Sequence, residues 1–426
     1  MHEDLGCDVL IVGCGVAGLY AALNLPRTCA ITMLSKGALE ECDSMLAQGG
    51  ICVLPDDADY DAFFEDTMRA GHYENRRESV EIMIRSSPAI IADLVRLGVA
   101  FERDESGGLA FTREGAHSRP RICYHADTTG KEITTRLLDA VRALPNVRIL
   151  ERVAMVDLLV AGGRCGGALV RLVAPEESTR TAPELREDAG ACFRVRALRT
   201  ILACGGIGGL YDRSTNYPQL TGDACMIAAE RGVALEHLDY VQIHPTGLYG
   251  EGPGRTFLIS ESCRGEGAIL LNRAGERFTD ELQPRDVVAA AIREQMRIDG
   301  TDHVSLSFER VASEVILSHF GTIRAHCLEA LGLDILHDPI PVVPTQHYFM
   351  GGISVDADGA TSMPGLFAAG ETACNGVHGR NRLASNSLLE SLVWARRAAW
   401  RISTGASLPL PLPSGNHVEQ EFAWTR

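Results

Sequence analysis

Apolar runs and helical spacing alternate at the start of the chain. Residues 7–13 and 29–34 are short, almost continuous apolar runs, which is typical of strands buried in a parallel sheet. Between them, apolar residues recur with helical spacing over residues 16–25. The pattern therefore predicts a β-α-β unit.

The remaining periodicity predicts an α/β protein. Strand patterns cover residues 147–150, 153–160 and 193–203, and residues 351–369 return to strand and turn. A hairpin with a long loop is expected at residues 161–190. Helical spacing covers residues 59–72, 76–97, 131–144 and 386–402, and Pro88 predicts that the second of these helices restarts there.

Residues 235–345 have a different texture, with extended pieces, glycine turns and two helices near 285–298 and 308–330. We therefore expect a discontinuous first domain at 1–236 and 348–405, and an inserted capping domain at 237–347. Leucine and proline alternate from residue 408, so residues 406–426 are expected to form an extended proline-rich tail.

Net charge narrows the range of partners. The chain of 426 residues carries a formal charge of −16, which repels nucleic acid and anionic membranes. Its N-terminus is acidic, and no apolar run approaches the ~18 residues that a membrane helix needs. The 13 cysteines include no pair at C-x-x-C spacing, which favours scattered buried thiols in a reducing cytosol. We predict a cytoplasmic protein without a metal, nucleic acid or membrane partner.

A glycine-rich turn joins the first strand to the first helix. Gly13 allows the tight turn, Gly15 lets a pyrophosphate approach the backbone, and Gly18 allows close packing of the helix. The helix N-terminus would then stabilise the phosphate charge. The turn matches G-x-G-x-x-G in the strand-turn-helix context that a dinucleotide site requires, and its residues are Gly13-Cys14-Gly15-Val16-Ala17-Gly18.

Later segments decide which dinucleotide is expected. The second strand ends in Ser35-Lys36, where an NAD site usually has a ribose-binding acid. Two more predicted strands, in residues 200–206 and 365–371, end in a glycine pair and in Gly-Glu. They resemble the second and third motifs of two-dinucleotide-type flavoproteins, which implies FAD and a contact between Glu371 and the ribityl chain.

Six further segments resemble the succinate dehydrogenase, fumarate reductase and L-aspartate oxidase flavoprotein family. They occur in family order, at residues 47–51, 221–223, 242–246, 264–267, 284–288 and 382–390. The resemblance implies a two-dinucleotide-type, Rossmann-like FAD-binding domain with an inserted α+β capping domain. Besides the glycine turn, the residues expected to contact FAD are Ser35, Lys36, Asp43, Ser44, Ala47, Gln48, Gly49, Gly50, Val153, Ala154, Ala203, Gly205, Asp223, Glu371, Ser387 and Leu388.

Four cationic or donor residues lie beside glycine or proline turns, namely His244, Arg285, His347 and Arg382. A dicarboxylate needs such groups at both ends, because Arg offers a bidentate fork and His can donate or change its charge. The resemblance implies that Arg285, His244 and Glu261 are catalytic. It also implies that the substrate is bound by Glu114, Gln242, His244, Ser260, His347 and Arg382.

Two positions separate the branches of this family. Succinate dehydrogenases and fumarate reductases attach FAD to a His at the position of Asp43, so a noncovalent flavin is expected. Residues 112–118 resemble the aspartate oxidase branch, in which the acid equivalent to Glu114 meets the substrate ammonium. Succinate has no cation to pair with that carboxylate, whereas aspartate does. The alternative interpretation of Glu114 is a surface turn residue.

For this branch the resemblance implies oxidation of L-aspartate to iminoaspartate by hydride transfer from Cα to flavin N5, the first step of NAD biosynthesis through quinolinate. Arg285 is expected to move the proton, with Glu261 as relay, because a guanidinium alone is a poor base. Dioxygen or fumarate would reoxidise the flavin, and quinolinate synthase would receive the product.

Two other functions stay open. One is a soluble fumarate reductase or succinate-oxidising flavoprotein, and the other is an FAD-binding subunit that needs an iron–sulfur partner. A purely structural role is disfavoured, because convergent cationic groups are costly without an anion. By this resemblance, aspartate oxidases commonly carry a C-terminal helical domain, so a chain that ends soon after Trp400 is expected to be either a short form or a truncated piece of a longer chain.

Overall fold

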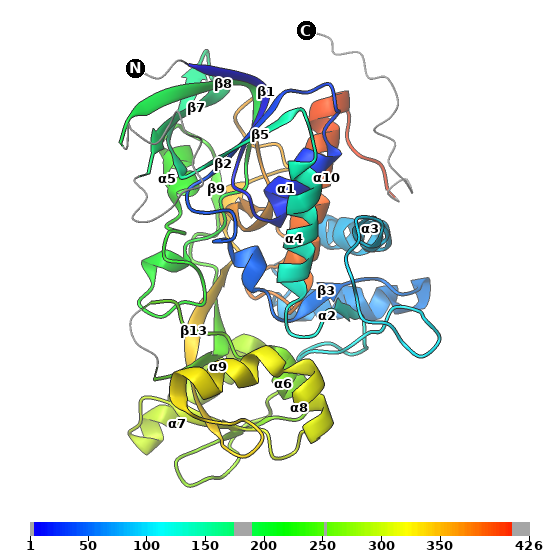
Figure 1. Ribbon diagram of the computed structural model, residues 1–426, viewed down its shortest axis with the longest axis vertical. Helices are drawn as coiled ribbons and strands as arrows, with labels where there is room; N and C mark the ends of the chain where they lie inside the picture. Colours follow the sequence, from blue (N-terminus) through cyan, green and yellow to red (C-terminus); the bar gives the residue numbers. More distant parts are fainter. Residues whose placement is uncertain (1–3, 174–189, 251–253, 411–426) are drawn as a thin grey trace.

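A computed structural model describes residues 4–173, 190–250 and 254–410 (Figure 1). One large sheet with its helices occupies the upper part of the view, and a smaller sheet with helices α6 to α9 occupies the lower part. Strand β13 extends upward from the smaller sheet toward the larger one.

The apolar runs form the centre of the large sheet, whose strand order in the described residues is β5-β2-β1-β8-β7-β6, with β15 also on β8. The first half of β8 pairs with β7 and its second half with β15, so both strands share one edge of β8. Five strands run parallel: β1 (Leu5–Val12), β2 (Ile31–Ser35), β5 (Val147–Glu151), β8 (Cys192–Leu202) and β15 (Leu366–Ala368). The antiparallel strands are β6 (Val153–Ala161) and β7 (Arg164–Leu172).

The turn after β1 depends on two glycines. Gly13 has φ +114°, and a Cβ there would fall 1.9 Å from the carbonyl oxygen of Ala203 at the end of β8. A Cβ on Gly18 would fall 2.0 Å from the carbonyl oxygen of Gly13. Only glycine therefore lets helix α1 (Val16–Asn24) start this close to the two central strands.

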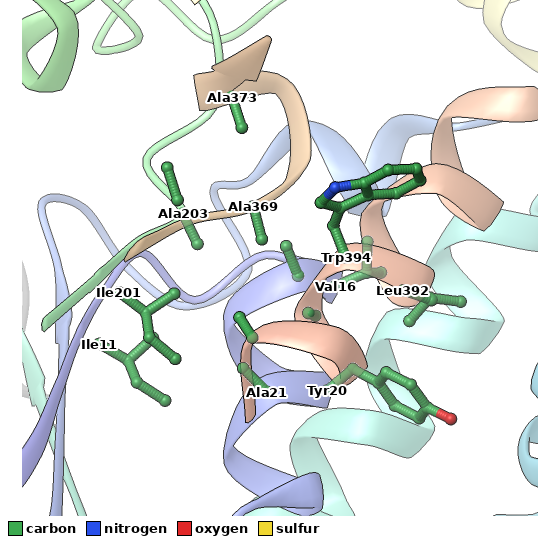
Figure 2. Close-up of a cluster of buried hydrophobic side chains, with 14 of the residues drawn as sticks. Ile11, Val16, Tyr20, Ala21, Ile201, Ala203, Ala369, Ala373, Leu392 and Trp394 are labelled. Carbon is green, nitrogen blue, oxygen red and sulfur yellow. The ribbon is translucent and has the colours of Figure 1, made fainter. Parts of the chain in front are cut away.

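Helix α1 packs against α4 (Thr129–Arg142) and α10 (Asn386–Thr404), and all three lie close together in Figure 1. Figure 2 shows the side chains of β1, β8, α1 and α10 that meet in this core, including Ile11, Ile201 and Trp394. All three are completely buried. The indole N–H of Trp394 donates to the carbonyl of Asp356 at 3.2 Å, so its polar atom is also satisfied.

Further helices and two small sheets complete this part of the fold. The helices are η1 (Asp43–Leu46), η2 (Asp57–Asp59), α2 (Tyr60–Ala70), α3 (Arg77–Arg96), η4 (Gly208–Leu210), α5 (Asp223–Glu230) and η5 (Gly370–Thr372). The strands form two small sheets, β3 (Gly50–Cys52) with β4 (Ile122–Tyr124), and β9 (Leu235–Glu236) with β14 (Gly352–Ser354) and β16 (Ala373–Cys374).

A second hydrophobic cluster is formed by buried residues that come from the sequence range Leu248 to Val342. Its sheet has the order β10-β13-β12-β11, with β10 (Val241–Leu248), β11 (Ile269–Leu271), β12 (Val304–Ser307) and β13 (Ile340–Phe349). Its helices are α6 (Glu261–Gly265), α7 (Arg285–Asp299), α8 (Ser313–His319) and α9 (Gly321–Leu331). The cluster falls inside the expected capping domain at 237–347, and the limits themselves stay a prediction.

Two helix expectations were wrong. Helix α3 runs through Pro88 without a restart, because the hydroxyl of Ser87 donates to the carbonyl of Ile84 at 2.6 Å, the group that Pro88 leaves without its N–H donor. The single helix expected near 308–330 is two helices that meet at Phe320. The long loop of the 161–190 hairpin and most of the proline-rich tail lie outside the described residues.

All 13 cysteines are free thiols, and Cys192 is exposed rather than buried. Within the described ranges, no helix has the length and apolar character needed to cross a membrane.

Replacement of Trp394 tests the core of the large sheet. Trp394→Ala should lower the free energy of unfolding by about 3–5 kcal/mol, because it leaves a cavity and removes one of the two hydrogen bonds that the carbonyl of Asp356 accepts. Trp400→Ala is the control, since Trp400 lies on the same helix but is only partly buried. Urea unfolding followed by circular dichroism would measure both variants, and equal losses would contradict the packing described here.

Candidate functional site

One cavity connects the carboxyl ends of the large sheet with the smaller sheet. Its volume is about 1820 Å³, including open space at its mouth. The glycine turn, the end of β2 and the end of β8 line one part, and His244, Ser260, Arg285 and Arg382 line the other. Ligands bind at this edge of open parallel sheets, so the location is suited to a nucleotide with a substrate beside it.

Most of the predicted FAD contacts line this cavity. Two do not, and both have a local reason. Ala154 lies on β6 between Val153 and Met155, which line the cavity, and alternate residues of a strand face opposite sides. Gly18 instead packs against the carbonyl of Gly13. The predicted residues that line the cavity are Gly13, Cys14, Gly15, Val16, Ala17, Ser35, Lys36, Asp43, Ser44, Ala47, Gln48, Gly49, Gly50, Val153, Ala203, Gly205, Asp223, Glu371, Ser387 and Leu388.

The dinucleotide end offers donors and acceptors that fit FAD. Helix α1 starts at Gly15 without a side-chain cap, and only Val16 N–H in its first turn meets a side chain, the hydroxyl of Ser44 at 3.1 Å. A phosphate can therefore bind the helix N-terminus. Lys36 pairs with Asp223 at 2.6 Å. The cavity thus holds an acid beside Lys36, although β2 itself does not end in one.

Two carboxyl groups lie where the flavin would be held. Glu371 accepts the backbone N–H of Phe349 at 2.8 Å, and Asp43 accepts that of Tyr217 at 2.9 Å. Burial and the neighbouring Asp43 raise the pKa of Glu371 to about 8. Burial raises the pKa of Asp43 to about 7, and its Oδ2 has no partner among the described residues. Both groups can take a further hydrogen bond from a polar ligand.

His244 presents one donor to the cavity. Its Nδ1 accepts the backbone N–H of Thr246 at 3.2 Å, which places the ring proton on Nε2. Nε2 is buried and meets no partner in the part of the chain that the structure describes. Burial, Arg285 and His347 lower the pKa of His244 well below its usual value, so the ring is neutral. It therefore offers an unpaired N–H to an acceptor.

Arg382 and His347 approach the same space. The guanidinium of Arg382 lies over the ring of Tyr348 at 4.3 Å and donates to Ser387 at 2.8 Å. Its Nε has no partner within the described ranges. The His347 ring lies 5.1 Å from that of His244, between centroids. Burial and Arg285 lower the pKa of Arg382 to about 10, so it stays cationic and can bind an anion.

Arg285, on the first turn of α7, is held by two side chains. Its Nε donates to Glu261 at 2.5 Å, and its Nη1 donates to Gln242 at 2.8 Å. Burial raises the pKa of Glu261, but Arg285 and Arg264 together lower it below its usual value. Glu261 is therefore ionised, and a buried carboxylate directly adjoins the cation.

Gln242 does not line the cavity, although it was predicted to bind substrate. Its amide group donates to Asn381 and to the carbonyl of Arg382, both at 2.8 Å, and accepts from Arg285. It thus links the two arginines from behind. Ser260, by contrast, lines the cavity and caps helix α6 by accepting the N–H of Ser262.

Glu114 is 4% exposed and lines the cavity, so the surface-turn interpretation was wrong. Its two carboxylate oxygens accept hydrogen bonds from Ser385 at 2.5 Å and Ser262 at 3.0 Å. Burial and the neighbouring Glu261 raise its pKa. The cavity therefore contains a second buried carboxylate that has no ion pair within the described residues.

Several site residues were missed at the sequence level. Thr215 shares a hydrogen bond with His347 Nδ1 at 2.7 Å, and nothing in its neighbourhood signals that role. Tyr348 follows His347 directly, and Ser385 lies inside the segment 382–390, so both had a signal that was not used. Arg264 also lies in a family segment and approaches Glu261 to 3.6 Å.

A buried polar group lies behind Arg382. Glu390 on α10 accepts a hydrogen bond from Asn375, and the ring of His378 contacts Tyr348 edge-on with centroids 5.4 Å apart. Burial raises the pKa of Glu390 to about 8. No cluster of three or more His, Cys, Asp or Glu side chains in the described residues is arranged to hold a metal ion.

Comparisons with known proteins agree with a flavin site. The chain matches the FAD binding domain family over residues 8–388. An L-aspartate oxidase of Clostridium perfringens is 48% identical over 398 residues, covering 93% of this chain and 87% of that protein. An L-aspartate oxidase of Neisseria meningitidis is 42% identical over 419 residues, covering 96% and 80%. A solved quinol fumarate reductase of E. coli has a TM-score of 0.85 at 29% identity, covering 95% of this chain and 72% of that one.

Glu390→Gln should change how stability depends on pH. Because the pKa of Glu390 rises from 4.5 to about 8 on folding, the native state holds this proton more tightly than the unfolded state. The free energy of unfolding of the unmodified protein should therefore fall as pH rises through that interval. The variant has no proton to lose at this position, so its stability should not show this fall. Melting temperatures would show an advantage of the variant that grows with pH. The exposed Glu294→Gln is the control, and an advantage that does not vary with pH would contradict the assignment.

Proposed function

The chain belongs to the FAD-binding L-aspartate oxidase family, and we propose that it oxidises L-aspartate to iminoaspartate with bound FAD. Iminoaspartate formation is the first step of NAD biosynthesis through quinolinate in this assignment. The observation that carries the choice of substrate is Glu114, a buried carboxylate that lines the same cavity as His244, Arg285 and Arg382.

FAD would be held noncovalently by the glycine turn, the α1 N-terminus, Lys36 with Asp223, and Glu371. Asp43 stands where a covalent His would be needed, and its carboxyl group already accepts a backbone N–H. When bound, FAD supplies the acceptor for the hydride that leaves Cα of the substrate.

The carboxylates of aspartate would be bound by His244, His347 and Arg382. His244 offers Nε2–H and Arg382 its unpaired Nε, both already oriented by other contacts. Because these groups are fixed before binding, little orientation is left to achieve at the barrier.

Glu114 would pair with the α-ammonium group. A carboxylate at this depth repels a ligand that carries only negative charge and attracts one that carries a cation. Burial and Glu261 raise the pKa of Glu114, and the hydrogen bonds from Ser385 and Ser262 oppose that rise by favouring the ionised form that this role requires.

The proton released from the amine would move toward Arg285 and Glu261. As the Cα–H bond breaks, the nitrogen loses a proton and the C=N bond forms. A guanidinium is a poor base when it acts alone, so Arg285 needs a partner. It can pass its Nε proton to Glu261, whose Oε2 lies 2.5 Å away, as it takes one from the substrate.

Fumarate or dioxygen would reoxidise the enzyme. Fumarate carries the same two carboxylates as aspartate, so the groups proposed for aspartate suit it as well. The likeness to quinol fumarate reductase supports this acceptor. We further propose that the unstable product passes to quinolinate synthase.

Anaerobic mixing tests the function directly. The FAD-loaded protein should lose its flavin absorbance band with L-aspartate and recover it when fumarate is added. Bleaching by succinate but not by aspartate would overturn the proposal in favour of a succinate-oxidising flavoprotein. Failure of the isolated chain to turn over with either ligand would favour a subunit that needs an electron-transfer partner.

Arg285→Leu should retain FAD but lose flavin reduction by aspartate. The variant removes the group between substrate and Glu261, so no path remains for the proton. Arg297→Leu is the matched control, because Arg297 lies exposed on the same helix α7. Stopped-flow absorbance would measure both, and normal reduction of the Arg285 variant would exclude it from proton transfer.

Glu114→Gln should raise the KM for L-aspartate by roughly tenfold to hundredfold, as expected when a buried charge loses its partner. The dissociation constant for succinate, measured from the shift of the flavin band, should stay equal or fall. A parallel weakening of both ligands would remove Glu114 from ammonium recognition.

A further inference from the structure

The Glu114 carboxylate stands at the start of a tight turn. The N–H of His117 donates to the carbonyl of Glu114 at 3.3 Å, which closes the turn over residues 114–117. Ala116 has φ +64°, a conformation that costs a non-glycine residue about 1–2 kcal/mol. Something must therefore hold this turn in place.

His117 holds it from the side that faces away from the cavity. Its Nδ1 lies 2.9 Å from Nη1 of Arg121, and an arginine can only donate, so Nδ1 is the acceptor. The ring proton is then on Nε2, which donates to the carbonyl of Ala384 at 3.0 Å. Burial and Arg121 lower the pKa of His117 to about 4, so this neutral tautomer persists at physiological pH.

Arg121 is itself fixed by two aspartates. It is 0% exposed and donates to Asp59 at 2.7 and 3.1 Å and to Asp66 at 2.7 Å. Asp66 also accepts the N–H and the hydroxyl of Ser118, at 2.7 and 2.6 Å. The cluster of Asp59, Asp66, Arg121 and His117 thus joins η2 and α2 to the end of the turn.

The contact with Ala384 connects this cluster to the second support of Glu114. Ser385, the next residue, has φ +61°, accepts the N–H of Gly50 at 3.1 Å and donates to Glu114. His117 therefore bridges the two backbone segments that orient the Glu114 carboxylate, one carrying the residue itself and one carrying its hydrogen-bond donor.

None of the four cluster side chains lines the cavity formed by the described residues. We propose that His117, anchored by Arg121 and its two aspartates, is a positioning residue that sets Glu114 against the substrate ammonium and so makes the site selective for an amino dicarboxylate. This inference rests on the proposed function, in which Glu114 meets that ammonium. Buried ion clusters contribute little net stability, which agrees with a role in geometry.

The proposal predicts a selective defect. A shift of the Glu114 carboxylate weakens only the ligand that carries an ammonium, because His244 and Arg382 hold the carboxylates from other segments. A displacement of ~1 Å at such a site can cost roughly a hundredfold. We therefore expect a tenfold or greater rise in the KM for L-aspartate and a change of less than twofold in succinate binding.

His117→Asn is the informative variant. Its amide oxygen can still accept from Arg121, so the ionic cluster stays satisfied, while the contact with Ala384 is lost. His117→Leu removes both contacts. Tyr20→Phe is the control, since it deletes a buried hydrogen bond to Asp93 at 2.8 Å in the core of the large sheet, away from Glu114. Each FAD-loaded variant is assayed for aspartate kinetics and titrated with succinate.

Both His117 variants should raise the aspartate KM relative to the succinate dissociation constant, and Tyr20→Phe should not. In the double variant His117→Asn with Glu114→Gln, the ratio of the aspartate KM to the succinate dissociation constant should equal that of Glu114→Gln alone. The reason is that no carboxylate is left to position. Equal weakening of both ligands, or additive effects in the double variant, would overturn the positioning role.

The two levels of inference can be separated. If Glu114→Gln leaves the aspartate-to-succinate ratio unchanged, the proposed recognition of the ammonium fails. If Glu114→Gln shifts the ratio and His117→Asn does not, recognition stands and only the positioning role of His117 is overturned.

Discussion

The substrate end of the site depends on buried charged groups and N–H donors that are not all neutralised by direct ion pairs. Arg285 has Glu261, but Arg382 has only an aromatic face and a hydroxyl, and His244 keeps an unpaired N–H among the described residues. Such groups are costly to bury, and a ligand with two carboxylates offsets the cost. Gln242 and Tyr348 help to keep these cations available for a ligand. Gln242 accepts a hydrogen bond from Arg285, and the ring of Tyr348 lies against Arg382, so each holds an arginine in place without neutralising its charge.

At the other end of the cavity, where the glycine turn lies, backbone groups rather than side chains shape much of the lining. The approach of Gly13 to Ala203 leaves no room for a Cβ, and the first turn of α1 keeps N–H groups available. Peptide groups are thus available at the proposed cofactor end, beside Lys36, Asp223 and Glu371, whereas the proposed substrate end is built mainly from charged and donor side chains. The two ends can change independently, which is consistent with a shared fold in relatives of different activity.

The sequence predicted the parts that depend on local pattern. The β-α-β unit, the glycine turn and the cationic residues all followed from spacing and motifs. Contacts between segments that are far apart in the sequence could not be predicted. Gln242 was therefore predicted to bind substrate, although it does not line the cavity, and Thr215 was missed. Ala154 was predicted together with Val153, but neighbouring residues of a strand face opposite sides, and only Val153 lines the cavity. At Pro88 the error was local, because a hydroxyl that substitutes for a backbone N–H leaves no periodic signal.

The shared edge of β8 also has a consequence for biosynthesis. Its second half pairs with β15, and α10 covers α1, yet both partners come from beyond residue 365. While the ribosome is still making the middle of the chain, the glycine turn already exists, but one wall of its pocket has not been synthesised. FAD can therefore be captured only after β15 and α10 have been synthesised, and until then the apolar faces of α1 and β8 need protection from aggregation.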